Sequence, residues 1–166
     1  MEEHQEIFDE LTQHFSQLLT EPNHERQEAI RRVTQHIPSL FNSEHNHSLM
    51  QPITMQEFEA AVEQMVDGTS PGPDGFTIDF FHQCWSLLKD EVLELVEEYR
   101  KKKWILLALN ATDLALIAKE IEAFHPNKFC PISLCNVIYK IISKVVANRL
   151  KPLLPLLISL EQSGIR

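Results

Sequence analysis

The sequence predicts an α+β fold that is mostly helical and contains one short β-hairpin. Over most of the chain, apolar residues recur at spacings of three and four, which places them on one face of a helix. One region, residues 111–134, instead has two short apolar runs separated by a polar turn, which is typical of a hairpin. With 166 residues, 43% of them apolar, the chain is long enough for one domain with a core of ordinary size.

The first part of the chain is expected to contain two helices and a loop. Residues 3–19 have a single apolar face, and Pro22 interrupts the pattern. A second helix is expected over residues 24–36. Residues 38–52 are polar and rich in His, Asn and Ser, so they are predicted to form a loop.

A third helix is expected to begin after Thr54. The Thr54 hydroxyl can accept a hydrogen bond from the Glu57 amide while the Glu57 side chain reaches back, which is the pattern of a capping box. An apolar stripe follows, and the helix is predicted to end at Asp67-Gly68, because Gly allows the chain to leave the helix.

The run Ser70-Pro71-Gly72-Pro73-Asp74-Gly75 cannot form regular structure, because its prolines lack amide donors and its glycines permit positive φ. Asp74 is expected to make a local Asx-type turn bond. The run lacks the Gly-Lys-Ser/Thr ending of a phosphate-binding loop, so it is interpreted as a structural turn. A long helix should follow and end at the basic residues 100–103, where cations offset the partial charge of a helix C-terminus.

The hairpin is predicted from a strand within residues 111–119, a turn over residues 120–128 and a returning strand over residues 129–134. Pro131 favours an edge position for the second strand. Residues 137–150 are strongly helical, and the prolines at 152 and 155 limit that helix.

Charge is spread unevenly along the chain. The net charge of −9 comes from residues 1–66, which hold twelve acidic residues and three arginines, whereas residues 67–166 hold twelve of each sign. Tight nucleic-acid binding usually needs a basic excess, so composition argues against it. No apolar run reaches the roughly 18 to 20 residues of a membrane span, and the acidic N-terminus lacks the features of a secretory signal. We expect an intracellular protein, nuclear or cytoplasmic, that is not secreted and has no membrane partner.

The cysteines favour a reducing compartment. Cys84, Cys130 and Cys135 cannot all be paired with one another. No set of Cys and His residues has the spacing of a zinc site, so no metal site is expected.

Several separated segments, in the right order, resemble the reverse transcriptase domain of LINE-type (non-LTR) retrotransposons, particularly those of plant genomes. They are residues 70–85, residues 109–119, the run Asn127-Lys128-Phe129-Cys130-Pro131-Ile132-Ser133-Leu134 with its continuation to Lys140, residues 147–150 and residues 161–164. The resemblance is close over residues 53–165. It implies that residues 1–52 are a helical linker-like segment. It also implies that residues 53–166 are a partial reverse transcriptase domain, whose hairpin resembles the fingers subdomain and which is truncated before the catalytic palm.

The resemblance implies an RNA-directed DNA polymerase, in which palm carboxylates hold two Mg²⁺ ions. In that family the carboxylates lie in an aspartate motif and a Tyr-x-Asp-Asp motif, whereas these 166 residues contain no adjacent pair of aspartates. The isolated Asp74 and Asp79 are not expected to be catalytic. We therefore expect a fragment of a transposable element without polymerase activity, catalytic residues or a cofactor. The alternatives are a weak RNA-binding or protein-interaction module and a non-functional pseudogene product.

Five cations are candidates for contact with a nucleotide or nucleic acid: Lys119, Lys128, Lys140, Lys144 and Arg149. The resemblance implies such a role for basic residues of the fingers hairpin, and Lys119 fits by position. Four departures point away from phosphate binding: Thr69 where the family has Lys, Asp113 where it is apolar, Ala118 where it has Pro, and Cys130 where it has Arg. A structural role is expected for residues 70–75 and for Pro131, Ile132 and Ser133.

Partners are expected to be few and weakly bound. RNA and retrotransposon proteins are the candidates, together with self-association through apolar surface exposed along residues 137–158. Phe80, Phe81 and Trp85 could stack on bases, but their helical spacing favours the core.

Overall fold

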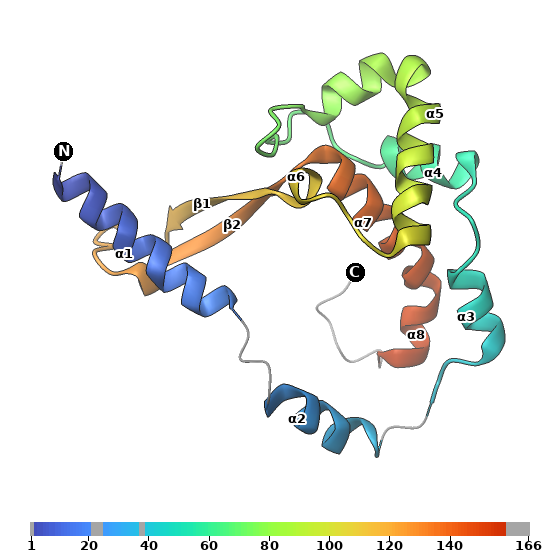
Figure 1. The fold of residues 1–166 in the computed structure, drawn as a ribbon, viewed down its shortest axis with the longest axis horizontal. Coiled ribbons are helices and arrows are strands. Elements are labelled where there is room, and N and C mark those ends of the chain that lie inside the picture. The colour runs from blue at the N-terminus through green and yellow to red at the C-terminus, as the bar shows by residue number, and fades with distance from the viewer. Residues whose placement is uncertain (1, 21–24, 37–38, 159–166) are drawn as a thin grey trace. The chain divides into compact units, whose positions relative to one another are not determined.

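The computed structural model describes residues 2–20, 25–36 and 39–158. It is mostly helical with one two-stranded antiparallel hairpin (Figure 1), so the predicted α+β class is confirmed. The chain divides into two compact units, which are described separately. The first holds the described parts of Met1–Ser39 together with Ala115–Ile132, and the second holds those of Leu40–Leu114 and Ser133–Arg166. The sequence predicted a different division, between a linker-like segment that ends at residue 52 and a partial reverse transcriptase domain that follows it. That division stays a prediction.

The first unit contains two helices and the turn of the hairpin. Helices α1 (Glu2–Leu19) and α2 (Glu25–Thr34) lie where the apolar spacing predicts them. Helix α1 contacts the short 3-10 turn η1 (Pro126–Lys128), and Phe15 of α1 is buried.

The hairpin itself is formed by strands β1 (Thr112–Ala118) and β2 (Phe129–Cys135). These bounds agree to within one residue with the predicted strands. The agreement follows from local signals: short apolar runs bounded by a polar turn are readable without tertiary context.

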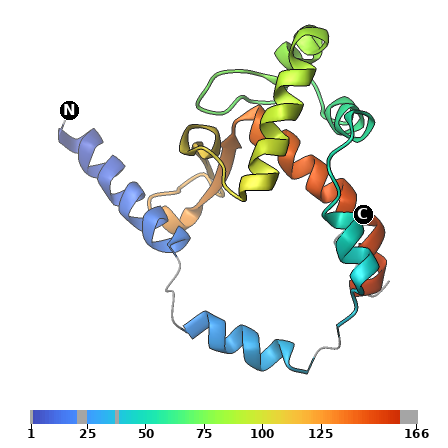
Figure 2. The same cartoon turned by 45° about the vertical axis from the view of Figure 1, so that its right-hand side comes forward.

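The second unit is organised around three helices: α4 (Met55–Glu63), α5 (Ile78–Lys102) and α7 (Val137–Leu150). Helix α5 lies beside α7 in two views (Figures 1 and 2). Their buried side chains form one core of Phe58, Ala61, Val62, Ile78, Phe81, Val92, Val96, Val137, Ile141 and Val145. Phe81 is therefore a core residue, and Trp85 packs on Phe58 with ring centroids 5.4 Å apart. Phe80 is exposed, so the core position expected for it is wrong, and its ring centroid lies 4.9 Å from that of Phe76.

The loop predicted for residues 38–52 is wrong in its middle part, which forms helix α3 (Ser43–Leu49). The Asn42 side chain accepts a hydrogen bond from the His45 amide at 2.8 Å, and the Asn42 amide donates to the His45 ring at 3.4 Å. This is a capping box in which His45 takes the place of the usual Glu or Gln. The usual signature has no His at that position, so the sequence pattern does not predict this helix.

Helix α4 begins as predicted but differs in two details. Thr54 Oγ1 accepts from the Glu57 amide at 3.2 Å, yet the Glu57 carboxylate does not return to complete the box, because Arg149 binds it. The helix ends at Glu63 rather than at Asp67-Gly68. Residues after it bond instead to the start of α5, where the Gly68 amide donates to Asp79 Oδ2 at 3.0 Å.

Three short helical segments were not predicted: α6 (Leu107–Asn110), η2 (Lys151–Leu153) and α8 (Leu154–Leu157). Helix α7 ends at Leu150, just before the prolines predicted to limit it. Across the described ranges, no helix combines the length and the apolar character that a membrane span requires.

Candidate nucleic-acid interface

The loop of residues 70–75 is fixed to the start of α7 by the side chain of Asn136, which is 1% exposed. Asn136 Oδ1 accepts a hydrogen bond from the Asp74 amide at 3.2 Å, and Asn136 Nδ2 donates to the Ala108 carbonyl at 2.9 Å. A buried amide is stable only when its polar atoms are paired, and here the pairing joins three chain segments. Asn136 was not among the predicted site residues, because its partners are distant in sequence.

Gly72 is required in this loop by close packing. A Cβ atom at Gly72 would lie 2.4 Å from the backbone nitrogen of Asn136 and 2.5 Å from the carbonyl carbon of Cys135. Within the loop, the Gly75 amide donates to the Gly72 carbonyl at 3.0 Å, and the Phe76 amide donates to Asp74 Oδ1 at 3.1 Å. The Asx-type turn bond predicted for Asp74 is therefore present.

Replacing Asn136 by Ala is expected to lower the free energy of unfolding by about 2 to 3 kcal/mol, because the Asp74 amide and the Ala108 carbonyl would be left without their buried partner. Urea denaturation would measure the change. Asn148→Ala, on the helix that Asn136 precedes, is the matched control and should stay within about 0.5 kcal/mol of the wild type. Equal stability of the two variants would contradict the role assigned to Asn136.

The three cations predicted on α7 lie in different surroundings. Lys140 Nζ donates to the Ser70 carbonyl at 2.8 Å and so holds the start of the Ser-Pro-Gly-Pro loop. Lys144 is half-buried, and in the described part of the chain its ammonium has no hydrogen-bonding or ionic partner. Arg149 does not lie on a solvated face, because its side chain is 15% exposed.

Arg149 is bound inside the second unit by five hydrogen bonds. It donates to both carboxylate oxygens of Glu57, at 2.5 and 2.8 Å. Its remaining donors bind the carbonyls of Leu49, Gln51 and Pro52 at 2.9, 2.7 and 3.1 Å. A phosphate would have to displace these partners, since every guanidinium nitrogen already donates within the protein.

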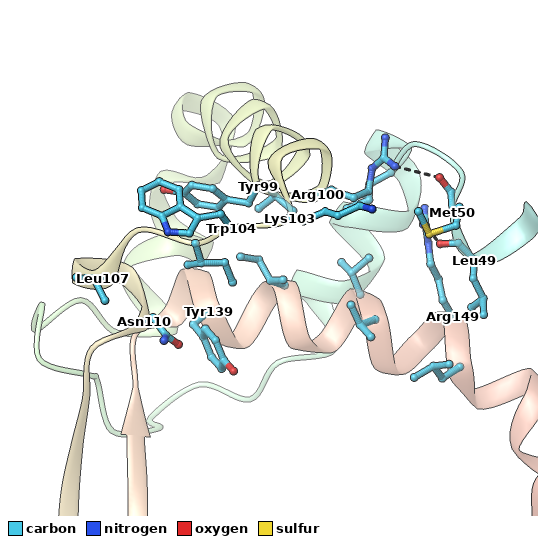
Figure 3. A pocket seen from close by; sticks show the side chains of 17 residues that line it. Leu49, Met50, Tyr99, Arg100, Lys103, Trp104, Leu107, Asn110, Tyr139 and Arg149 are labelled. Atoms are coloured by element: carbon cyan, nitrogen blue, oxygen red, sulfur yellow. Dashed lines mark hydrogen bonds between the residues drawn. The ribbon is translucent and has the colours of Figure 1, made fainter. Parts of the chain in front are cut away.

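Arg100 also binds the segment that connects α3 to α4, which Arg149 holds through its carbonyls (Figure 3). Its guanidinium donates to the Met50 carbonyl at 3.0 Å and, in a two-pronged pair, to Glu97 at 2.7 and 2.8 Å. Glu97 in turn accepts from the Ile53 amide at 2.7 Å. The hydrogen bonds from Arg100 hold the pKa of Glu97 below its usual range. Together, Arg100 and Arg149 clamp the chain between α3 and α4.

The two hairpin lysines, in the first unit, are brought opposite each other. The Lys119 amide donates to the Lys128 carbonyl at 2.9 Å. The Lys119 ammonium donates to the Asn127 carbonyl at 3.1 Å, and the Lys128 ammonium pairs with Glu120 at 2.9 Å. Both ammonium groups remain accessible, so the hairpin presents two cations whose charge is partly offset by one carboxylate.

An apolar groove of about 810 Å³ lies in the second unit between the C-terminal part of α5 and helix α7 (Figure 3). We call it the α5–α7 groove. The hydroxyl of Tyr99, one of its lining residues, is buried and has no hydrogen-bond partner among residues 2–20, 25–36 and 39–158, and burial raises the pKa of Tyr99. The lining residues are Leu49, Met50, Ile53, Val96, Tyr99, Arg100, Lys103, Trp104, Ile105, Leu107, Asn110, Tyr139, Ile142, Val145, Val146, Arg149 and Leu150.

His82 joins the end of α4 to α5 through two acceptors. His82 Nδ1 lies 2.6 Å from Asp67 Oδ1, and Nε2 lies 3.0 Å from the Val62 carbonyl. Because both ring nitrogens face acceptors, the doubly protonated ring is favoured. The pKa of His82 is raised, first by the bond to Val62 and then by Asp67 and Asp79, while burial opposes the shift.

A raised pKa makes stability depend on pH. The contribution of His82 to the free energy of unfolding is fully present below its unfolded-state pKa of about 6.5. It is lost as pH rises through the higher folded-state pKa. The wild type should therefore have a higher free energy of unfolding than His82→Gln, and this difference should be larger at pH 6 than at pH 8. Urea denaturation at each pH would measure it. His47→Gln, on the exposed face of α3, is the control. A difference that is independent of pH would contradict this prediction.

All three cysteines are free thiols. Among the residues that the structure describes, no three His, Cys, Asp or Glu side chains are grouped closely enough to hold a metal ion.

Comparison with known proteins relates the chain to a mobile element. Over 112 residues, or 68% of the chain, it is 34% identical to the "Transposon TX1 uncharacterized 149 kDa protein" of Xenopus laevis. The matched region spans 9% of that protein. No family model matches the chain. The similarity supports a transposon-related origin.

Proposed function

We propose that the chain is the fingers region of a LINE-type reverse transcriptase, with a helical linker-like segment before it. The main support is the contact between the loop of residues 70–75 and Asn136. The loop and the run that leads into Asn136 are the two segments that most strongly carry the resemblance, and they bind each other in the fold. The relation to a transposon protein and the hairpin at the expected position add to this support.

We further propose that these 166 residues do not polymerise nucleotides by themselves. Two-metal phosphoryl transfer needs carboxylates that converge on two ions about 3.5 to 4 Å apart. The sequence contains no adjacent aspartates, and Asp74 and Asp79 make local bonds to the Phe76 and Gly68 amides. Primer extension on an RNA template with Mg²⁺ should give no product above a buffer control. Product that depends on this chain would overturn the proposal.

The assignment as fingers is tested by a chimera. Residues 53–158 would replace the corresponding segment of an active LINE-type reverse transcriptase, and primer extension would be measured. We expect weak activity, because the four departures from the family pattern remain. Cys130→Arg restores the residue that the family has at one of these four positions. It should raise the activity, since Arg donates to phosphate in a two-pronged manner. Cys84→Arg, on α5, is the matched control. If Cys130→Arg gave no more activity than Cys84→Arg, the assignment would be contradicted.

Weak binding of single-stranded RNA is the second candidate function, favoured by the opposed Lys119 and Lys128. Amide shifts in NMR titrations should centre on residues 119–128 and should decrease with salt, because phosphate contacts release counterions. The double variant Lys119→Ala/Lys128→Ala should reduce the salt slope by about 1.4, or ~0.7 for each phosphate that is no longer neutralised. Lys89→Ala removes a lysine that is paired with Glu59 on the surface, and it serves as the control. Shifts that persist in the double variant would reject the hairpin as the binding surface.

A further inference from the structure

Two large apolar side chains project into solvent at the turn of the hairpin. Ile121 is 105% exposed and Phe124 is 82% exposed. Acidic residues flank them: Glu120 pairs with Lys128, whereas Glu122 is exposed and has no ionic partner within the described ranges. We call Ile121, Glu122 and Phe124 the hairpin knob. Contiguous exposed apolar surface marks interaction sites in many proteins.

The α5–α7 groove has complementary properties. Its lining is mainly aliphatic and aromatic, and Trp104 and Leu107 within it are 54% and 82% exposed. Arg100 and Arg149 are already neutralised by Glu97 and Glu57. Lys103 is exposed, and in the described part of the chain its ammonium has no partner. The groove therefore offers apolar contacts next to one uncompensated cation.

We propose that the α5–α7 groove of one copy binds the hairpin knob of a second copy, so that the chain self-associates through this contact. The volume of about 810 Å³ is sufficient for the side chains of Ile121 and Phe124. Glu122 of the second copy carries a negative charge that can pair with Lys103, and this complementarity favours the knob as occupant. The proposal does not depend on the reverse transcriptase assignment.

Analytical ultracentrifugation over a range of concentrations tests the proposal. The wild type should sediment as monomer in equilibrium with a dimer or a larger assembly, and the associated fraction should rise with concentration. Ile121→Ser/Phe124→Ser and Leu107→Glu should each weaken dimerisation at least tenfold. These side chains are exposed, so the variants should keep the wild-type circular dichroism spectrum. Leu87→Glu is the matched control, because Leu87 is 76% exposed on α5 but does not line the groove.

Mixing the two interface variants distinguishes a specific contact from general stickiness. The knob variant retains an intact groove and the groove variant retains an intact knob, so one contact can form between them. We expect a heterodimer at concentrations where each variant alone is monomeric. A wild type that is monomeric throughout, a loss of dimer in Leu87→Glu as well, or an absence of heterodimer would each overturn the proposal.

A charge exchange tests the polar part of the contact. Glu122→Lys and Lys103→Glu should each weaken the dimer several-fold, and the chain carrying both substitutions should regain most of the affinity. The effect should diminish as salt is raised, because exposed charge pairs are screened. Equal weakening that is not recovered in the double variant would rule out pairing between these two residues.

Discussion

Replacing Arg149 by Ala is expected to lower the free energy of unfolding by about 3 kcal/mol. The substitution leaves the Glu57 carboxylate and three backbone carbonyls without their donor in a site where Arg149 is 15% and Glu57 26% exposed. Breaking a buried ion pair from one side costs about 3 to 5 kcal/mol, and the partial exposure places this case at the lower end. Urea denaturation, followed by circular dichroism, would measure the change.

Two further variants make this prediction specific. Lys144→Ala lies on the same helix and should stay within about 0.5 kcal/mol of the wild type. Arg149→Lys should be intermediate, because an ammonium can pair with Glu57 but cannot also reach the carbonyls with a planar fork. If Arg149→Ala were as stable as Lys144→Ala, the clamp would have no energetic importance.

Replacing Gly72 by Ala is expected to cost about 2 to 3 kcal/mol, because the added methyl group would lie 2.4 Å from the Asn136 nitrogen and 2.5 Å from the Cys135 carbonyl carbon. These are backbone atoms, so the clash cannot be relieved by rotating a side chain. The variant should also shift the amide resonances of Asp74 and Asn136, since the loop must move away from α7.

Gly75→Ala provides the control within the same loop. Its φ of +76° makes a side chain unfavourable by about 1 to 2 kcal/mol, but no atom of the described residues lies within 4 Å of the added Cβ. Gly75→Ala should therefore destabilise less than Gly72→Ala and should leave the Asn136 amide unchanged. The reverse order would mean that backbone conformation, rather than contact with α7, explains the glycine at position 72.

These contacts bear on the proposed function. Of the five candidate cations, Arg149 is held by Glu57 and three carbonyls and Lys140 by the Ser70 carbonyl, whereas Lys144 has no partner among the described residues and the ammonium groups of Lys119 and Lys128 remain accessible. This agrees with the even charge balance of residues 67–166 and predicts RNA binding that is weak and strongly dependent on salt. The similarity to a transposon protein bears on the origin of the chain. The RNA titration measures whether the chain binds RNA.

Local chemistry made several features predictable from the sequence. The hairpin strands, the limits of α7 and the Asx turn at Asp74 depend on residues within a few positions of one another. Prolines, glycines and apolar spacing act at this range, so their effect is readable without knowing the fold. Local signals failed for α3, where His45 substitutes for the usual capping residue, for the end of α4 and for the short segments α6, η2 and α8.

The roles of individual polar side chains depended instead on contacts between distant segments. Glu57 carries the signature of a capping residue, yet it pairs with Arg149, 92 residues away. Asn136 bonds to the Asp74 amide across 62 residues, and Arg149 reaches the Leu49 carbonyl across 100. A side chain bonds to whichever unsatisfied group the fold brings near it, and burial makes that choice costly to change. For this reason the helices could be inferred from spacing, whereas the clamp, the loop anchor and the α5–α7 groove arise only when the chain is folded.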